Sequence, residues 1–288
     1  MGYKKPTTVS RTYLENAMLP QHDPSYTVIS HKFIIENTKD LLQLHGFRVV
    51  KETYRANQNA NVAQGIYVIE PVNVMTPAFT PNPNITKDNE LAMTFAWTNS
   101  YDKSIRFQCA IGASVTVCSN GMMCGEMKFA RKHTGAADAD ILAQITEQIK
   151  AADNTYKTIV QDKENLKGVS ISLRTQAELI GRLYYELNLL EANQLTIIKQ
   201  EMKSPSFNYN VDSNSAWAFY NHVTHALKKS HPRVWMKSSH RFHEFMTQEF
   251  LSNTPSTMND TVKVSENTWN MDFEEAAINV DDLLDSLG

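Results

Sequence analysis

The apolar positions in the first half of the chain follow a helical period and then a strand period. A short β-prone run covers 26–29, Ser30 stands where a helix N-cap is expected, and apolar residues recur at helical steps until Gly46. This pattern predicts a helix over about 31–45, because serine caps the first turn and glycine favours a helix end. Apolar, β-prone runs then predict five strands, over 47–54, 65–69, 90–97, 104–111 and 113–118.

The second half of the chain has a helical period throughout. Apolar residues from Ile141 to Ile159 recur at three- and four-residue steps, which predicts one long amphipathic helix over about 136–166. Similar patterns predict further helices over 175–189, 193–202, 214–229 and 239–251. Between the two halves of the predicted sheet, residues 73–89 carry three prolines and no helical pattern, so we expect a long exposed loop there.

These elements predict an α+β protein. Short connections between strands favour antiparallel neighbours, and one helix can cover one face of such a sheet. We therefore expect an antiparallel sheet with one covering helix in the N-terminal half, a helical C-terminal half and a disordered acidic tail. The expected boundaries are an extended N-terminal arm at 1–24, a β-rich α+β region at 25–135, a helical region at 136–252 and the tail at 253–288.

Composition excludes several classes of protein. Of the 288 residues, 42% are hydrophobic and 20% are charged, which is typical of a globular chain. No run of about eighteen apolar residues occurs, and no apolar stretch follows the first lysines, so we expect neither a membrane-spanning helix nor a secretory signal. Three cysteines suit a reducing compartment better than a disulfide scaffold. The expected location is the cytoplasm, with no membrane partner.

The net charge of −3 is distributed unevenly along the chain. Residues 264–288 hold seven acidic side chains and no Lys or Arg, which leaves 28 basic and 24 acidic side chains, a net charge of +4, in the rest. A mildly basic body favours an anionic partner such as nucleic acid. The acidic tail also fits a purely solubilising role, and that alternative stays open.

No motif in the sequence indicates catalysis or a cofactor. The glycine-rich phosphate loop, the serine-hydrolase elbow, the zinc-protease motif and the dinucleotide fingerprint do not occur. The residue types of a zinc site occur once, as Cys109, Cys118, Cys124 and His133. Their spacings of nine, six and nine residues do not match the close pairs of a zinc knuckle. We therefore expect no metal and no cofactor, while an enzyme remains an open alternative.

One stretch combines cations with aromatic rings. Residues 213–243 contain no Asp or Glu but hold five of the nine histidines and two of the four tryptophans. Cations attract phosphates and aromatic rings accept unstacked bases, so this composition favours a surface for single-stranded nucleic acid. In the alternative, the rings are core residues and the cations are solvated. The candidate phosphate contacts here are Lys228, Lys229, Arg233, Lys237 and Arg241, and Trp235 is a candidate stacking residue.

Two further cationic segments belong to the same candidate surface. Residues 128–135 form a basic stretch before the long predicted helix, whose first backbone amides favour anions. A capped helix start with a solvated turn explains this stretch equally well. Its candidate contacts are Lys128, Arg131 and Lys132, and the turn after Asn99 adds Lys103, Arg106 and a second stacking candidate, Tyr101.

The acidic tail alternates acids with apolar residues. Such a segment is expected either to occupy a basic groove in the absence of nucleic acid or to bind a partner protein. Its composition is similar to the acidic C-termini of phage and bacterial single-strand binding proteins, although it ends in Leu-Gly. The candidate partner-binding residues are Phe273, Asp281, Asp282, Leu283, Leu284 and Asp285.

Several motifs in one order resemble a known family. They are Ser30-His31-Lys32, Asn99-Ser100-Tyr101-Asp102-Lys103-Ser104, Cys118-Ser119-Asn120-Gly121-Met122, Arg131-Lys132-His133-Thr134-Gly135 and Trp217-x-x-Tyr220-Asn221-x-x-Thr224. On these motifs, residues 25–251 are identified as a member of the phage and plasmid family known as domain of unknown function 932. The resemblance implies a phage or mobile-element origin and the cytoplasm of a bacterial host. The order of elements is also similar to phage single-strand annealing proteins of the Red-beta and Erf type, from which no residue is carried over.

Two functions follow as hypotheses. The first is a phage-encoded protein of replication or recombination that binds single-stranded DNA, anneals or protects strands, forms homo-oligomers and recruits replication proteins through its tail. The second is a non-enzymatic protein–protein interaction module, such as an inhibitor of a host defence complex. Binding of single-stranded DNA distinguishes the two.

Overall fold

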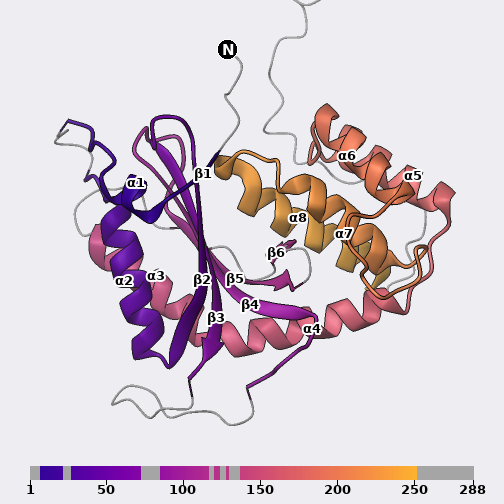
Figure 1. The fold of residues 1–288 in the computed structure, drawn as a ribbon, viewed down its shortest axis with the longest axis horizontal. Helices are drawn as coiled ribbons and strands as arrows, with labels where there is room; N and C mark the ends of the chain where they lie inside the picture. Colours follow the sequence, from indigo (N-terminus) through magenta and orange to yellow (C-terminus); the bar gives the residue numbers. More distant parts are fainter. Residues whose placement is uncertain are drawn as a thin grey trace, which may run out of the picture. The chain divides into compact units, whose positions relative to one another are not determined.

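The computed structural model describes residues 7–21, 27–72, 85–116, 120–123, 128–129 and 137–251. At its centre lies an antiparallel sheet in which β1 to β6 follow one another in sequence order (Figure 1). The short strand β7 pairs with β5. Consecutive strands are neighbours, as short connections favour. The strands are β1 (Thr7–Val9), β2 (Phe47–Ala56), β3 (Val62–Pro71), β4 (Leu91–Ser100), β5 (Gln108–Val115), β6 (Gly121–Met123) and β7 (Lys128–Phe129).

Helices pack on both faces of this sheet. In Figure 1, α2 and α3 lie on one face and α8 on the other, with α5, α6 and α7 on the α8 side. The residues up to Ser252 form one compact unit, in which the predicted α+β class and helical second half are confirmed. The helices are α1 (Arg11–Glu15), α2 (His31–Leu44), α3 (Ala137–Lys150), α4 (Ala152–Lys167), α5 (Leu173–Gly181), a π-helical turn (Arg182–Glu186), α6 (Ala192–Lys203), α7 (Ala216–Leu227) and α8 (Pro232–Phe250).

The sheet face beneath α2 and α3 carries the main hydrophobic core. Tyr54, Tyr67 and Trp97 lie there, each buried. The Trp97 indole N–H donates to the Tyr67 hydroxyl at 3.0 Å, and the Tyr54 hydroxyl lies 3.3 Å from that of Tyr67. These large rings therefore bury their apolar area and still satisfy their polar atoms, which a dry core requires.

The opposite face of the sheet is covered only in part, by α8. Trp235 and Met236 of α8 pack on small residues of β4 and β5. Gly121 permits this close approach, because a Cβ atom there would lie 2.7 Å from the Trp235 indole. Gly112 makes room within the sheet itself, because a Cβ atom there would lie 2.2 Å from the Met123 side chain of β6. Helix α8 packs mainly on β3, β4 and β6, so the part of the face formed by β1 and β2 stays open.

Several boundaries in the β-rich half differ from the predictions. The strands expected over 104–111 and 113–118 are one strand, β5, because Gly112 pairs with neighbours on both sides instead of ending the ladder. The arm expected to be extended over 1–24 contains β1 and α1, and Ser10 caps α1 by accepting from the Tyr13 amide. Residues 27–30 form no strand.

The helical half also differs in two places. The helix expected over 136–166 is interrupted at Ala151, so its apolar stripe is shared between α3, which packs on α2, and α4, which packs on β5 and α7. Helix α8 begins at Pro232, seven residues before its predicted start. Proline ends a helix but is also favoured in the first turn of one, and here it holds that first position after the N-cap His231.

The described end of the loop expected over 73–89 is held firmly by α4. The Lys163 side chain is 1% exposed, and its ammonium lies 2.6 Å from the Asp88 carboxylate and 3.0 Å from that of Glu90. The Asp88 carboxylate also accepts from the backbone amides of Glu90 and Leu91. This buried cluster fixes where β4 starts, so residues 85–90 do not form a free contact loop.

Candidate nucleic-acid interface

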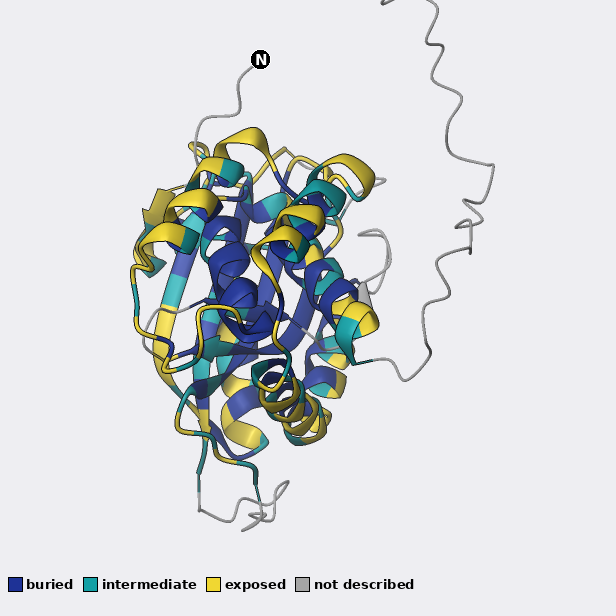
Figure 2. Cartoon of the chain, turned by 90° about the vertical axis from the view of Figure 1, so that its right-hand side faces the viewer, coloured by how far each residue is buried: buried dark blue, intermediate teal, exposed yellow. Residues whose placement is uncertain are grey.

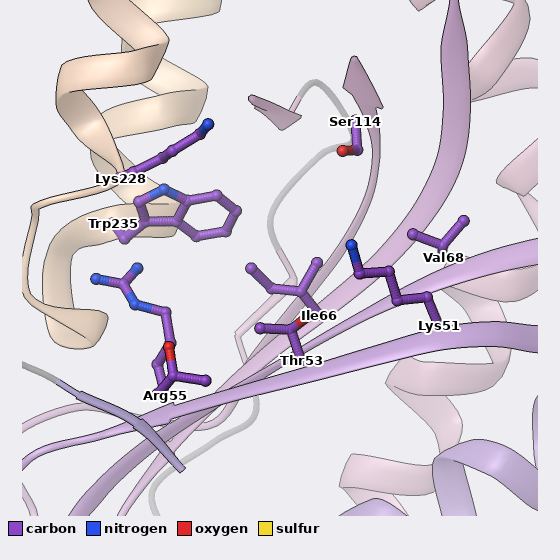
Figure 3. A pocket seen from close by; sticks show the side chains of 9 residues that line it. Lys51, Thr53, Arg55, Ile66, Val68, Ser114, Lys228 and Trp235 are labelled. Carbon is purple, nitrogen blue, oxygen red and sulfur yellow. The ribbon is translucent and has the colours of Figure 1, made fainter. Parts of the chain in front are cut away.

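A cavity of about 270 Å³ lies on the open part of the sheet, under the start of α8 (Figure 3). Figure 3 shows the Trp235 indole and the Lys228 side chain facing the side chains of β2 and β3 across it. Its lining combines an apolar surface with three cations and three hydroxyl groups, and none of the nine lining residues is acidic. They are Thr8, Lys51, Thr53, Arg55, Ile66, Val68, Ser114, Lys228 and Trp235.

The strand period places these side chains on one face. Successive side chains of a strand point to opposite faces, so Lys51, Thr53 and Arg55 share the open face while Tyr54 enters the core. The antiparallel register extends this polar row across the neighbouring strands, with Thr8 opposite Arg55, Ile66 opposite Thr53 and Val68 opposite Lys51.

Arg55 is the most constrained cation in the cavity. Its guanidinium donates to Gln64 Oε1 at 3.2 Å and to the Ser230 carbonyl at 2.6 Å, and both acceptors are neutral. Burial lowers the pKa of Arg55 to about 10, so the group stays charged at neutral pH. An arginine has five N–H donors, and these two bonds leave three of them and the full charge for an anionic ligand.

The turn between α7 and α8 adds positive potential beside the cavity. Burial lowers the pKa of His231, and the neighbouring charges of Arg233 and Arg55 lower it further. Burial likewise lowers the pKa of His225; the nearby Glu201 carboxylate opposes this decrease, and the charges of Lys228 and Lys229 add to it. These imidazoles are therefore held neutral, while the arginines and lysines around them supply the positive charge.

The structure brings some of the predicted cations to one end of the molecule. Arg233 donates to the Asp102 carboxylate at 3.1 Å, which joins the β4–β5 turn to the start of α8. Lys103 and Arg106 are exposed on that turn. Other predicted cations are exposed or half-buried but lie outside the cavity lining: Lys229, Lys237 and Arg241. Of the predicted residues that the structure describes, Lys228 and Trp235 line the cavity.

Tyr101 does not fit the expected role of a base-stacking residue. It is 5% exposed, and its ring stacks on the His31 imidazole with centroids 4.0 Å apart. Its hydroxyl accepts from the His31 backbone amide at 2.7 Å, and the Asn99 side chain lies 3.2 Å from His31 Nδ1. Two of the motifs that identify the family thus meet in the core, where they attach the β4–β5 turn to α2.

The aromatic residues of 213–243 also lie mostly in the core. Every residue of α7 except His225 is buried, and in Figure 2 the buried segments, in dark blue, gather in the interior of the described fold. The Trp217 ring stacks on that of Tyr220 at 5.4 Å. Trp235 is only 4% exposed, so it presents part of its indole to the cavity but no open ring face on which a base stacks. For α7, the core alternative considered above is the correct one.

A second pair of family motifs also meets inside the protein. The Asn120 side chain donates to the Asn221 carbonyl at 3.1 Å and lies 3.3 Å from the Tyr209 hydroxyl. This contact joins the segment before β6 to α7, across 101 positions of sequence. Like the contact at Tyr101, it explains the motif through folding rather than through ligand binding.

Several predicted residues lie wholly or partly outside the described residues. Lys128 belongs to β7, but its side chain is not described. Two of the predicted cations lie outside the described residues, Arg131 and Lys132. The same holds for all the tail candidates: Phe273, Asp281, Asp282, Leu283, Leu284 and Asp285. It also holds for three members of the zinc set considered above, Cys118, Cys124 and His133. Cys109 is buried in β5, and burial raises the pKa of its thiol. Among the described residues, no His, Cys, Asp and Glu side chains group as metal ligands.

The prediction missed the cations that the sheet itself supplies. Lys51 and Arg55 flank Thr53 at alternate positions of a predicted strand, and this polar alternation was the available signal. It marks a solvent-facing strand surface, but it does not reveal that α8 covers part of that surface.

In the part of the chain that the structure describes, no helix is both long and apolar enough to cross a membrane.

A comparison with protein families agrees with the motifs. The family model described as "Domain of unknown function (DUF932)" matches residues 21–266, which is most of the chain, and the chain therefore belongs to this family. No match was found among curated proteins or among solved structures.

Proposed function

We propose that this member of the DUF932 family binds single-stranded DNA on the open part of its sheet. It would act as a phage- or mobile-element-encoded protein of replication or recombination, in the cytoplasm of a bacterial host. The observation that carries the proposal is Arg55, a half-buried cation with neutral partners in a cavity whose described lining residues include two lysines and no acid. A desolvated charge without a counterion is costly, and a bound phosphate supplies that counterion.

The shape of the cavity favours a single strand over a duplex. Its volume of about 270 Å³ lies just below the range of about 300–1,000 Å³ typical of sites for drug-sized ligands, so it fits one nucleotide unit. Ile66, Val68 and the indole of Trp235 offer apolar contact to a base, while Lys51, Arg55 and Lys228 are placed for phosphates. A base is free to enter such a cavity only when it is unpaired.

The proposal is tested by titrating fluorescent single-stranded and duplex oligonucleotides at two salt concentrations. We expect binding that favours single strands and weakens with salt. In the triple variant Lys51→Gln, Arg55→Gln, Lys228→Gln, the slope of log affinity against log salt should fall by about 2, at about 0.7 per lost phosphate contact on a single strand. Arg48→Gln is the matched control, because Arg48 lies on β2 but is exposed and paired with Glu70 outside the cavity.

Absence of binding by the wild-type chain to any oligonucleotide would contradict the proposal. The interaction-module hypothesis would then lead, and a stable complex with a host protein would be its evidence. Within the DNA-binding proposal, the acidic tail serves to recruit replication or recombination proteins, and deleting 264–288 should abolish that recruitment while single-strand binding persists.

A further inference from the structure

We infer that a DNA strand bound in the cavity runs along β2, with its sugar–phosphate backbone on β2 and its bases turned inward to β3 and α8. This inference rests on the proposed function, because it gives the path of the strand through the same cavity. It comes from the way in which the sheet sorts polar and apolar side chains onto different strands.

The polar side chains of β2 form a row along the cavity. Lys51, Thr53 and Arg55 occupy alternate positions of this strand, so they share the open face at steps of about 7 Å. Figure 3 shows Lys51 and Arg55 on opposite sides of Thr53. A nucleotide rises about 3.4 Å along a duplex, and in an extended single strand successive phosphates lie about twice that distance apart. A strand that follows β2 therefore places one phosphate at Lys51 and another, two steps further along, at Arg55.

The two cations of this row are available to phosphates for different reasons. Lys51 is exposed and forms no hydrogen bond or ion pair with the described residues. Both partners of Arg55, Gln64 and the Ser230 carbonyl, are neutral, and burial alone shifts its pKa. A lysine is a flexible point charge, whereas a held arginine is a planar fork. Arg55 thus fixes the position of the strand, and Lys51 follows the next phosphates.

The row of available cations ends on β2 at Arg48. Arg48 is opposite Glu70, which lies two positions beyond Val68 on β3, so Arg48 is also on the open face. Its guanidinium lies 2.7 Å from the Glu70 carboxylate, so its charge is balanced within the protein. A β-bulge between Arg48 and Lys51 also interrupts the strand. The row therefore spans Lys51 to Arg55, a length that accommodates three successive phosphates.

The apolar side chains lie on the inner side of this row. Ile66 is opposite Thr53 and Val68 is opposite Lys51, and the Trp235 indole of α8 faces them across the cavity (Figure 3). Bases gain from contact with apolar side chains, whereas phosphates favour cations that remain in contact with water. Because β2 lies nearer the edge of the sheet than β3 does, the backbone lies outside and the bases inside.

The test is a chemical double-mutant cycle on a thymidine tetranucleotide with hydroxyl ends, which has three phosphodiesters. Each phosphodiester is replaced in turn by a neutral methylphosphonate, and calorimetry at low salt measures the affinity. In wild type, we expect each outer replacement to weaken binding about tenfold and the middle one, which faces Thr53, about twofold. One outer replacement should lose its effect in Lys51→Gln and the other in Arg55→Gln. Should Arg55→Gln fold poorly in circular dichroism, Lys51→Gln alone still assigns one outer phosphate.

Tetranucleotides with one abasic position test the inner side. Val68→Ala should weaken binding of the parent tetranucleotide about threefold, and this effect should disappear when one particular base is absent. The same variant should not change the effect of any methylphosphonate. Arg48→Gln is the matched control, because it removes a cation from the same face of the same strand beyond the end of the row, and it should leave every one of these effects unchanged.

Failure of the inference is distinguishable from failure of the proposed function. Equal sensitivity at the three phosphates, or coupling of Lys51 and Arg55 to the same phosphate, would overturn the path along β2 and leave single-strand binding in place. Coupling of Val68→Ala to a methylphosphonate would overturn the inward orientation of the bases. Binding of a long single strand but not of the tetranucleotide would overturn the short span. Absence of binding by any single strand would overturn the proposed function together with the inference.

Discussion

The two faces of the sheet come from the same strands but are built on different chemistry. On the α2 side, Tyr54, Tyr67 and Trp97 satisfy one another's polar atoms within the protein. On the α8 side, Arg55 is held by neutral acceptors and its charge has no carboxylate partner among the cavity residues. The first face satisfies its polar atoms within the protein and contributes stability, whereas on the second face we propose that an anionic ligand balances the charge of Arg55. A β-strand can serve both purposes because its side chains alternate.

The largest expected effect contrasts Trp97 with Trp235, one buried tryptophan on each face of the sheet. Trp97→Ala should lower the free energy of unfolding by about 3–5 kcal/mol, because it removes a fully buried ring from the main core. At low temperature, where the variant stays folded, its affinity for single-stranded DNA should remain unchanged. Trp235→Ala should weaken DNA binding and cost less stability. Urea unfolding and oligonucleotide titration measure both, and a larger DNA-binding defect in Trp97→Ala would break the comparison.

The α2 face should also be the more sensitive to acid, through His31. Burial lowers the pKa of His31 to about 4, from the ordinary value of 6.5, so the unfolded chain takes up a proton that the folded protein excludes. The stability associated with neutral His31 is complete above pH 6.5 and is lost as the pH falls toward 4. From this shift we expect a loss of about 3 kcal/mol in full, of which about 2 kcal/mol is lost by pH 5.

The measurement is the free energy of urea unfolding at pH 7 and pH 5, in wild type and in His31→Gln. The variant should be less stable at pH 7, because it loses the contacts of the ring with Ala60 and Tyr101. Its further loss between pH 7 and pH 5 should be smaller than that of wild type by about 2 kcal/mol. An unchanged pH dependence would show that His31 titrates normally in the folded protein.

A smaller effect is expected where α8 approaches the sheet. Gly121→Ala places a Cβ atom 2.7 Å from the Trp235 indole, so the ring must move, at a cost of about 1–3 kcal/mol in unfolding free energy. Because Trp235 lines the cavity, single-strand binding should weaken as well. Gly181→Ala is the control, because nothing lies within 4 Å of its added methyl group, and it should be neutral or slightly stabilising. Equal behaviour of the two variants would contradict close packing at Gly121.

The smallest effect is expected on the outer surface of α8. Lys237 and Arg241 are candidate phosphate contacts, but they do not line the cavity. The double variant Lys237→Gln, Arg241→Gln should therefore lower the salt slope of single-strand binding by less than the triple cavity variant does. A larger decrease, measured by the same titration, would move the principal binding surface from the sheet to the helix.

Much of the fold was predictable because local signals agreed with tertiary packing. Ser30 does accept a hydrogen bond from the Phe33 amide, and α2 begins and ends close to the predicted residues. The errors occur where one residue type serves two purposes. Gly112 separates the strands predicted over 104–111 and 113–118, although it lies within β5 where Met123 needs the space. Pro232 falls between the helices predicted over 214–229 and 239–251, although it starts α8.

The candidate site was predictable only in part, because it forms from segments far apart in the sequence. Lys228 and Trp235 were indicated by a local composition of cations and rings. Arg55 reaches the Ser230 carbonyl across 175 positions, and no local pattern indicates that contact. Tyr101 was a candidate stacking residue because the sequence places it in a turn, where side chains are usually exposed. Its burial depends on stacking against His31, a contact across 70 positions of sequence.

The buried thiol of Cys109 can report on local unfolding of the sheet. This thiol is fully buried near the start of β5, and burial raises its pKa, so thiol reagents reach it only after the strand separates from its neighbours. In a variant that keeps this cysteine and carries serine at 118 and 124, the rate of thiol labelling would report how often the sheet opens and exposes the core. A ligand bound on the opposite face would slow that labelling by stabilising the closed sheet, so modification kinetics would detect occupancy without any dye on the ligand.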